Sequence, residues 1–309
     1  MTALKIDPAR RDAWLQLLRA PNLLTVPGDA AAGCALAAAW RGIAPPFSGL
    51  ILTALSVLFL YSFGLILNDL VDVKADRKNR TGRPLAEKTI TLPAAVAATL
   101  ACLVLGLLSA WVIGGAVFVI ALVLAITIGA YNCVLKRFSI PGSIAMGVCR
   151  GLSLTLGAAA VHVYALPAVL AAIGLGLFIG FVTWIADHEE GFYDFDRQAF
   201  LPVYGYALAF LLPLTLITLQ QPGTRLLFCL VPLILGFFRV VYISHSLSQG
   251  AIPPGTIQRS IGAYIRALIP LQAAFLLMGM GVFAALLGGL TALIVWPAAR
   301  VLSHRFYAS

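Results

Sequence analysis

One amide and three carboxylates stand close together where a long apolar segment gives way to a basic one: Asn68, Asp69, Asp72 and Asp76. An α-helix turns about 100° per residue, so Asp69, Asp72 and Asp76, at positions i, i+3 and i+7, share one face. Like charges at this spacing repel one another unless a cation neutralises them. Hard oxygen ligands suit Mg²⁺, which shares its coordination sphere with phosphate oxygens. The cluster therefore predicts a magnesium-diphosphate site.

A second acidic cluster repeats this spacing. Asp187, Glu190 and Asp194 again lie at i, i+3 and i+7, and Glu189 stands among them. Both clusters follow an apolar segment, which predicts two similar halves whose acidic ends face each other across one cavity. Gly191 could end the helix and spoil the common face. The alternative for this cluster is a set of solvated carboxylates at a helix end.

The composition excludes a soluble domain. Hydrophobic residues make up 61% of the chain, charged residues only 11%, and the mean hydropathy is +0.97. We expect an all-α polytopic membrane protein in which residues 1–309 form one domain, with about nine transmembrane helices around a central cavity. The apolar segments are 20–40, 47–68, 91–110, 112–131, 141–161, 167–186, 201–219, 225–243 and 265–287. Residues 287–303 could be a tenth span, a re-entrant piece or an interfacial helix.

Basic residues concentrate before the first span, after the second and fourth spans and before the ninth, and the positive-inside rule places these connections in the cytoplasm. Both acidic clusters follow an even-numbered span, so both should face the cytoplasm. This orientation and anionic lipid account for the net charge of +9, so no nucleic-acid partner is needed. The N-terminus lacks the features of a removable signal peptide. We expect an integral protein of a bacterial inner membrane with a cytoplasmic active site and the lipid bilayer as its surroundings.

Cations follow the first acidic cluster in the sequence Arg80-Thr-Gly-Arg83-Pro84. A mouth lined by cations and metal ligands, opening into an apolar cavity, suits a diphosphate head with a hydrocarbon tail. An allylic prenyl diphosphate is such a substrate. Metal and cations would stabilise the leaving diphosphate, and the apolar cavity would keep water from the allylic cation.

The first acidic cluster resembles the first aspartate-rich motif of the UbiA superfamily of intramembrane prenyltransferases. Arg80-x-x-Arg83-Pro84 resembles the loop that follows that motif, Arg19-Ala-Pro-Asn22 resembles the family's opening helix, and Tyr131 with Lys136 resembles its tyrosine-lysine element. The resemblance implies an all-helical fold and a requirement for Mg²⁺, with no further cofactor. It implies catalytic and metal-binding roles for Asp69, Asp72 and Asp76, and substrate-binding roles for Asn22, Asn68, Arg83 and Lys136. The repeated acidic spacing adds Asp187 and Glu190 as candidate catalytic and metal-binding residues, and Arg150 and Glu189 are further candidate substrate-binding residues.

The second cluster departs from the family's usual motif, because it reads Asp187-His-Glu-Glu190-Gly191. The run from Met146 to Gly157 is similar to a bacterial branch encoded in the ebo gene cluster, in which a Glu matches Glu189. The resemblance leaves open whether the second motif supports the usual transfer and the usual acceptors.

Other polar residues lie within apolar segments. Asp29 is costly to bury, so a functional role is the first interpretation, and Arg150 either stabilises the diphosphate or pairs with Asp29. Arg239, Tyr242 and His245 share a helical face, where they could contact the acceptor or snorkel to the interface.

We therefore expect Mg²⁺-dependent transfer of a prenyl group from a prenyl diphosphate to an aromatic or other lipid-forming acceptor. The alternatives are a membrane transporter, which the intramembrane charges would suit, and a family member that binds prenyl lipid without catalysis. Acceptor identity, prenyl chain length and oligomeric state are not indicated.

Overall fold

The computed structural model describes residues 8–79, 82–161 and 165–305, and these are almost entirely helical. The elements are α1 (Pro8–Leu17), α2 (Ala20–Leu23), α3 (Val26–Arg41), α4 (Phe47–Asn79), α5 (Leu92–Ile113), α6 (Gly115–Cys133), η1 (Leu135–Arg137), α7 (Ser139–Ala159), α8 (Leu166–Ala186), η2 (Asp196–Phe200), α9 (Leu201–Gln220), α10 (Arg225–Leu247), α11 (Pro254–Arg266), α12 (Leu268–Met278), α13 (Val282–Leu290), the π-helical η3 (Thr291–Val295) and α14 (Trp296–Arg305).

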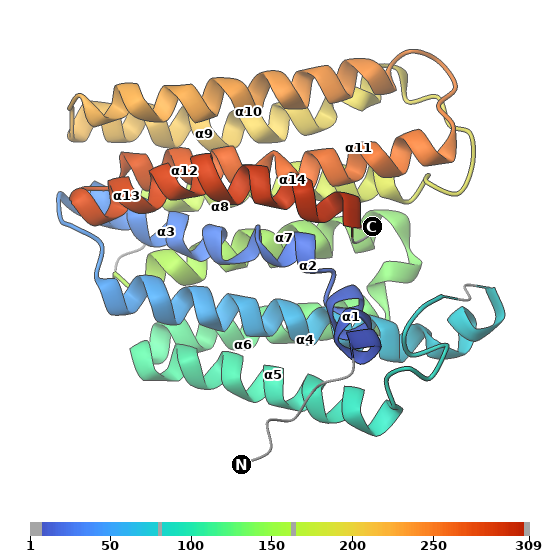
Figure 1. Ribbon diagram of the computed structural model, residues 1–309. Coiled ribbons are helices and arrows are strands. Elements are labelled where there is room, and N and C mark those ends of the chain that lie inside the picture. The colour runs from blue at the N-terminus through green and yellow to red at the C-terminus, as the bar shows by residue number, and fades with distance from the viewer. Residues whose placement is uncertain (1–7, 80–81, 162–164, 306–309) are drawn as a thin grey trace.

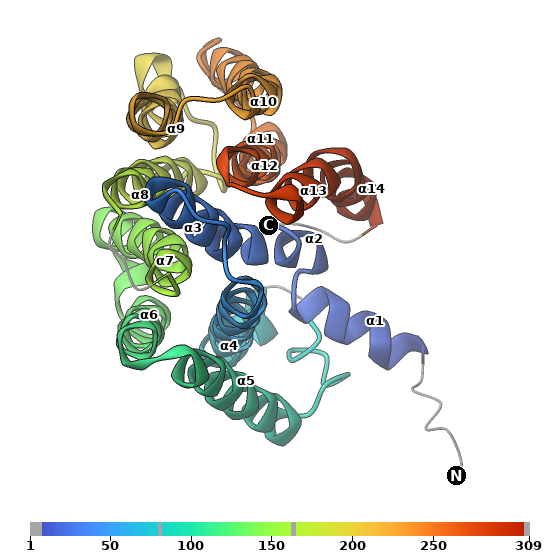
Figure 2. The same cartoon turned by 90° about the vertical axis from the view of Figure 1, so that its left-hand side faces the viewer.

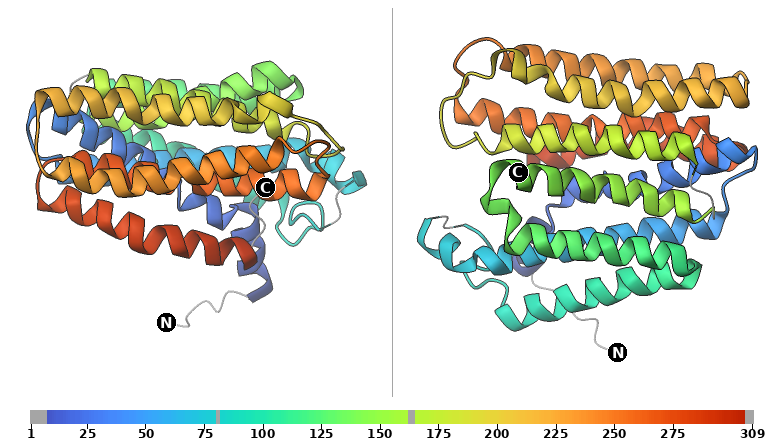
Figure 3. Two further views of the ribbon diagram at one scale, coloured as in Figure 1. Left: turned by 90° about the horizontal axis from the view of Figure 1, so that it is seen from above. Right: turned by 180° about the vertical axis from the view of Figure 1, so that it is seen from behind.

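The long helices lie side by side, and most pack against their neighbours in sequence (Figure 1). Viewed along the helix axes, α3 occupies the middle of the bundle, where it packs against α4, α7, α8 and α12 (Figure 2). The α4–α5, α8–α9 and α10–α11 connections lie at one end of the bundle (Figures 1 and 3). Both acidic clusters are at that end.

Proline and glycine set several helix boundaries. Pro93 and Pro167 stand in the first turns of α5 and α8, where a missing backbone N–H costs nothing. Gly42 ends α3 with a φ of 67°, a left-handed conformation that glycine adopts without steric penalty. These local signals help to explain why α5 and α8 begin, and α3 ends, close to the limits of the apolar runs.

Small residues bring the central helices into close contact. A Cβ atom at Gly157 of α7 would overlap the carbonyl oxygen of Ala30 on α3, and one at Gly147 would overlap that of Gly176 on α8. Backbones can approach this closely only where side chains are absent, which is a common device in membrane helix packing. The fit holds α3, α7 and α8 together beside the acidic clusters.

Eight described segments are long and apolar enough to cross a membrane, and large apolar side chains cover the outer faces of helices such as α5 and α10. α3 and α7 are not among these eight, but they pack against each other and against α4 and α8. The predicted helical membrane fold is therefore confirmed.

The C-terminal segments differ from the expectation. The predicted span 265–287 is wrong, because the helical segment runs over Pro254–Met278 and a break at Gly279 separates it from α13. The polar residues of α11, such as Gln258 and Arg259, lower the local hydropathy, so the apolar pattern does not show where this helical segment begins. The segment Val282–Val301, whose form the sequence left open, is helical and long enough to span.

Candidate active site

The first acidic cluster lies on the last turns of α4. This helix has 33 residues, so at 1.5 Å per residue it is about 50 Å long and exceeds the roughly 30 Å apolar core of a bilayer. The excess length carries the cluster beyond the apolar part of the helix. Asp69 and Asp76 are nearly buried, with 7% and 6% of their surface exposed, whereas the side chain of Asp72 is 33% exposed.

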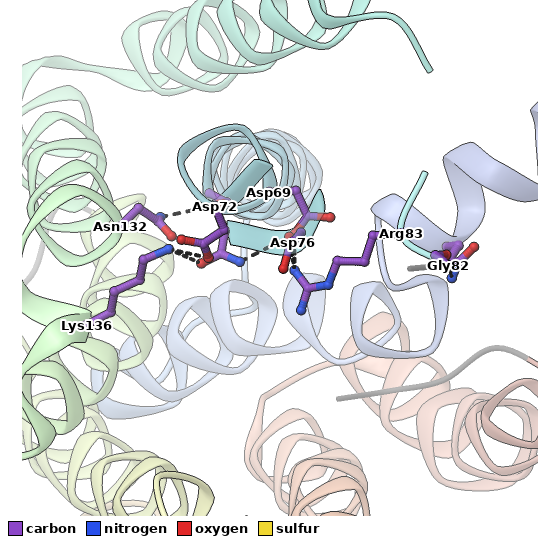
Figure 4. Close-up of polar contacts among 10 residues, drawn as sticks. Asp69, Asp72, Asp76, Gly82, Arg83, Asn132 and Lys136 are labelled. Carbon is purple, nitrogen blue, oxygen red and sulfur yellow. Dashed lines mark hydrogen bonds and ion pairs between the residues drawn. The ribbon is translucent and has the colours of Figure 1, made fainter. Parts of the chain in front are cut away.

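Arg83 neutralises two of these carboxylates. Its Nη1 atom lies 3.2 Å from Oδ1 of Asp69 and 3.2 Å from Oδ2 of Asp76, and donates a hydrogen bond to each (Figure 4). The connection after α4 turns back to bring this guanidinium against the helix that precedes it. The neighbouring motif residue Arg80 lies outside the described residues.

Lys136 neutralises the third carboxylate from another part of the chain. It belongs to η1, in the α6–α7 connection, and its Nζ atom donates hydrogen bonds to Oδ2 of Asp72 at 2.6 Å and to Oδ1 of Asn68 at 3.0 Å. Lys136 approaches Asp72 from one direction, and Arg83 approaches the neighbouring Asp69 and Asp76 from the other (Figure 4). The three aspartates are thus divided between two cations.

The second acidic cluster lies in a loop. The expectation that Asp187, Glu190 and Asp194 share a helical face is wrong, because α8 ends at Ala186 and the following residues form turns. The interruption comes even before Gly191, at Asp187, which caps the helix. Asp187 accepts a hydrogen bond of 2.6 Å from Oγ of Ser139 at the start of α7, which fixes the carboxylate beside that helix.

One cavity of about 810 Å³ joins the two acidic clusters. The carboxylates that line it are Asp69, Asp187, Glu189 and Glu190, the cations are Arg19, Arg83 and Arg150, and the expected substrate-binding residue Asn22 lines it as well. The remaining expected residues, Asn68, Asp72, Asp76 and Lys136, are not in its lining. They form the network of hydrogen bonds and ion pairs described above.

A smaller cavity of about 200 Å³ shares lining residues with the first. Arg19, Tyr61, Tyr131, Met146 and Arg150 contribute to both. The small cavity reaches between α4, α6 and α7, where its other lining residues include Asn68, Val57, Leu65, Leu124 and Ile128. A charged chamber therefore adjoins a mainly apolar one, with Arg150 at the boundary.

Arg150 is held at this boundary by a buried polar network. Its Nη1 atom lies 2.6 Å from Oδ2 of Asp29, and its Nη2 atom donates a hydrogen bond of 2.9 Å to Oγ1 of Thr25. Gln272 of α12 donates from Nε2 to Oδ1 of Asp29 at 2.6 Å and to the carbonyl oxygen of Thr25 at 2.6 Å. The two interpretations of Arg150 are therefore compatible, because the residue both pairs with Asp29 and lines the cavity.

Several residues that line the large cavity have no predicted catalytic or binding role in the sequence. Arg19, Tyr61, Tyr131 and Gln258 all line the large cavity. Tyr61 could have been found from its position about two turns before Asp69 on the same helix. Arg19 stands immediately before α2 with a φ of 46°, so the backbone turns sharply at a residue whose side chain reaches the site.

The donor set fits a shared magnesium ion better than an all-protein metal cage. Among the described residues, no group of three or more His, Cys, Asp or Glu side chains is arranged to hold a metal. Magnesium commonly takes one or two carboxylates and completes its octahedron with water and substrate phosphate oxygens. Asp69 on one wall of the cavity and Asp187 and Glu190 on the other can supply such carboxylates.

Fold and site together define an all-helical membrane protein with a charged cavity at one end of the bundle and an apolar chamber beside it. The chain belongs to the UbiA prenyltransferase family, whose sequence profile matches residues 30–254.

Curated relatives bear the name digeranylgeranylglyceryl phosphate synthase. The protein from Saccharolobus solfataricus is 26% identical over 187 residues, which cover 60% of this chain and 64% of the relative. One from Methanococcus maripaludis is 31% identical over 149 residues, which cover 48% of this chain and 52% of the relative. The matches thus span between half and two thirds of these relatives.

Solved structures share the fold. A UbiA homologue from Aeropyrum pernix K1 has a TM-score of 0.60 at 17% identity, and the match covers 82% of this chain and 96% of that one. A digeranylgeranylglyceryl phosphate synthase has a TM-score of 0.59 at 19% identity, covering 87% and 98% of the two chains. At these identities the likeness concerns the arrangement of the helices alone.

Proposed function

We propose that this protein transfers a prenyl group from a prenyl diphosphate to a lipophilic acceptor in a Mg²⁺-dependent reaction. The observation that carries the proposal is the single cavity of about 810 Å³, in which carboxylates from both acidic clusters face arginine side chains. The adjoining apolar chamber gives the hydrocarbon chain a place next to the diphosphate. Membership of the UbiA prenyltransferase family supports the same activity.

The cations have two successive roles in this proposal. Before substrate binds, Arg83 neutralises Asp69 and Asp76, and Lys136 neutralises Asp72. When Mg²⁺ and diphosphate bind, Asp69, Asp187 and Glu190 of the cavity lining would hold the metal, with Asp72 and Asp76 of the same helix as Asp69 as further candidate ligands. The metal would supply positive charge to the leaving group. Arg83 and Lys136 then pair with phosphate oxygens. In this proposal Mg²⁺ replaces the cations as partner of the aspartates, and the diphosphate replaces the aspartates as partner of the cations. This exchange requires little rearrangement of α4.

The reaction breaks the allylic C–O bond, and the diphosphate departs with the electron pair. Preorganised cations stabilise the negative charge that develops on the leaving oxygen. A nucleophilic atom of the acceptor forms the new bond to the allylic carbon and loses one proton, for which Glu189 is a nearby base on the cavity wall. Apolar residues around the chain exclude water from the cation.

The acceptor is an aromatic or other lipid-forming molecule. The name of the curated relatives denotes a prenylated glyceryl phosphate product, which favours a lipid-forming acceptor for this chain as well. Arg19 and Arg150 line the part of the cavity next to the apolar chamber and suit a polar group on that acceptor. The resemblance to the ebo-cluster branch stays a prediction.

We further propose that the site faces the cytoplasm of a bacterial inner membrane. The basic residues of the α4–α5 and α6–α7 connections, which include Arg83 and Lys136, lie at the same end of the bundle as the cavity. The positive-inside rule assigns that end to the cytoplasmic side.

The test is Mg²⁺-dependent diphosphate release by purified protein, with prenyl diphosphates of several chain lengths and a membrane-lipid extract as the source of acceptor. Asp69→Asn is the variant, and Asp12→Asn is the matched control, because Asp12 lies on α1 with its side chain 45% exposed and pairs with Arg11. Release that requires Mg²⁺ and is lost only in Asp69→Asn supports the proposal.

Two other outcomes would count against transfer. Mg²⁺-dependent binding of the prenyl diphosphate without release would identify a non-catalytic binder, which the position of the second acidic cluster in a loop also favours. If the protein neither binds the prenyl diphosphate nor releases diphosphate, a role in transport is favoured instead. The buried Asp29–Arg150 ion pair is the feature that suits a transporter.

A further inference from the structure

An aromatic cluster lies beside the second acidic cluster, at the point where α8 ends. Its members are Trp184, His188, Tyr193 and Phe195. The ring centroid of His188 lies 4.0 Å from that of Tyr193, 4.9 Å from that of Trp184 and 5.8 Å from that of Phe195. Rings pack against one another at such distances. Phe195 is 1% exposed, so the cluster reaches from the turn into the buried part of the protein.

The imidazole of His188 also replaces a backbone hydrogen bond at the end of α8. In a continued helix the backbone N–H of His188 would bond to the carbonyl oxygen of Trp184, four residues earlier. It bonds instead to the carbonyl oxygen of Ile185 at 3.1 Å, and the Nδ1 atom of the imidazole donates a hydrogen bond of 2.9 Å to the oxygen of Trp184. A carbonyl group at the helix end thus gains a donor, and the hydrogen bond orients the ring.

The turn after α8 separates its carboxylates from this ring. Asp187, Glu189 and Glu190 line the large cavity, whereas His188, which stands among them in the sequence, does not. The imidazole packs into the aromatic cluster instead. The same turn therefore presents three carboxylates to the cavity and anchors itself through the fourth side chain.

The aromatic cluster is joined to a second wall of the cavity. Tyr193 and Ile252 exchange two backbone hydrogen bonds, of 3.2 and 2.9 Å, which connect the α8–α9 and α10–α11 connections at one end of the bundle (Figure 1). Helix α11 follows Ile252 and contributes Gln258, Ile261 and Ile265 to the cavity lining. The turn with the second acidic cluster is thus held by α8 on one side and by the segment that leads to α11 on the other.

We propose that His188 is a positioning residue for the second acidic cluster, because its imidazole holds the turn that presents Asp187 and Glu190 to the cavity. This inference rests on the proposed transferase function, in which these carboxylates help to hold Mg²⁺. Helix α8 ends at Ala186, so a continuous helix does not fix their positions, and ring packing takes over that role. Magnesium requires near-ideal octahedral geometry, so even a small displacement of the turn weakens metal binding.

The experiment measures the binding of Mg²⁺ and inorganic diphosphate to the full chain in detergent by titration calorimetry. The variants His188→Ala and Tyr193→Ala each remove one ring of the aromatic cluster. Phe192→Ala is the matched control, because Phe192 precedes Tyr193 in the same loop but is 75% exposed and lies outside the cluster. Both cluster variants should need about tenfold more Mg²⁺ for half-saturation, the lower end of the usual cost of losing a group that orients a metal ligand. The control should match the wild type.

Two further measurements separate positioning from a general loss of stability. In His188→Ala, hydrogen–deuterium exchange should be faster at residues 187–195 and unchanged in α4 and α7. The variant His188→Phe keeps a ring in the cluster, so it should recover part of the lost affinity for Mg²⁺. It also takes the place of His188→Ala if that variant does not fold, since the remaining loss of affinity is still compared with Phe192→Ala.

Wild-type binding of Mg²⁺ and diphosphate, together with equal Mg²⁺ requirements in the cluster variants and Phe192→Ala, would overturn the positioning role and leave the proposed function intact. Faster exchange throughout the bundle of His188→Ala would also overturn it, because the ring would then support the whole fold rather than this turn. Failure of the wild-type protein itself to bind Mg²⁺ and diphosphate would count against the proposed function, and the positioning role would fall with it.

Discussion

The Nζ atom of Lys136 lies 2.6 Å from Oδ2 of Asp72, and this contact joins the α6–α7 connection to the end of α4. The two residues are 64 positions apart, so only the folded bundle makes the contact. Both side chains are partly exposed, 15% for Lys136 and 33% for Asp72, which leaves them free to exchange partners. In the proposed reaction Lys136 moves from this carboxylate to a phosphate oxygen.

Lys136→Met should lower the rate of diphosphate release by about 10²- to 10³-fold, the usual cost of removing one preorganised group that stabilises developing negative charge. The same variant should bind Mg²⁺ in the absence of substrate at least as tightly as the wild type, because Asp72 loses a competing cation. Steady-state release and titration calorimetry measure the two effects. A fall in both activity and metal affinity would contradict the proposed exchange.

Asp187→Asn should reduce release strongly, by about 10²-fold or more, because Asp187 lines the cavity opposite Asp69 and carries charge that the metal requires. Asp194→Asn should stay close to wild type. Asp194 is exposed, does not line the cavity and accepts a hydrogen bond from the backbone N–H of Asp196. Release assays at saturating Mg²⁺ compare the two. Equal losses would show that the second cluster acts as a helix-end charge rather than as a site.

Asp29→Asn should destabilise the protein by roughly 3 to 5 kcal/mol, because it leaves Arg150 charged and buried without its partner. The double variant Asp29→Asn with Arg150→Met should recover part of this loss. Unfolding by denaturant in detergent measures the free energies. Asp12→Asn is the control, since the exposed Asp12–Arg11 pair contributes less than about 1 kcal/mol. A single variant as stable as this control would contradict the structural role of the pair.

Gly157→Ala should destabilise the bundle by about 1 to 3 kcal/mol, because the added methyl group meets the backbone of Ala30 and forces α3 away from α7. Gly129→Ala is a matched change on α6, where a Cβ meets nothing within 4 Å. That control should be neutral or slightly stabilising, because alanine is the better helix former. Thermal unfolding of the two variants side by side measures the difference, and similar midpoints would disprove the close helix contact.

The sequence indicated most of the helical fold and the first acidic cluster. Runs of apolar residues about the length of a membrane span locate helices directly, and a single uninterrupted helix preserves the spacing of Asp69, Asp72 and Asp76. Charge composition and the distribution of Lys and Arg are equally local properties. The start of α11 could not be located from the sequence, because its polar residues lower the mean hydropathy of that segment.

The tertiary structure decided which groups meet. The helix expected to carry Asp187, Glu190 and Asp194 on one face ends at Ala186, where the chain instead forms turns and Ser139 of α7 donates a hydrogen bond to Asp187. The division of the three aspartates between Arg83 and Lys136 depends on two connections that fold back onto α4. Residue spacing along one helix follows from backbone geometry, but contacts between helices depend on the packing of the whole bundle, which no local pattern encodes.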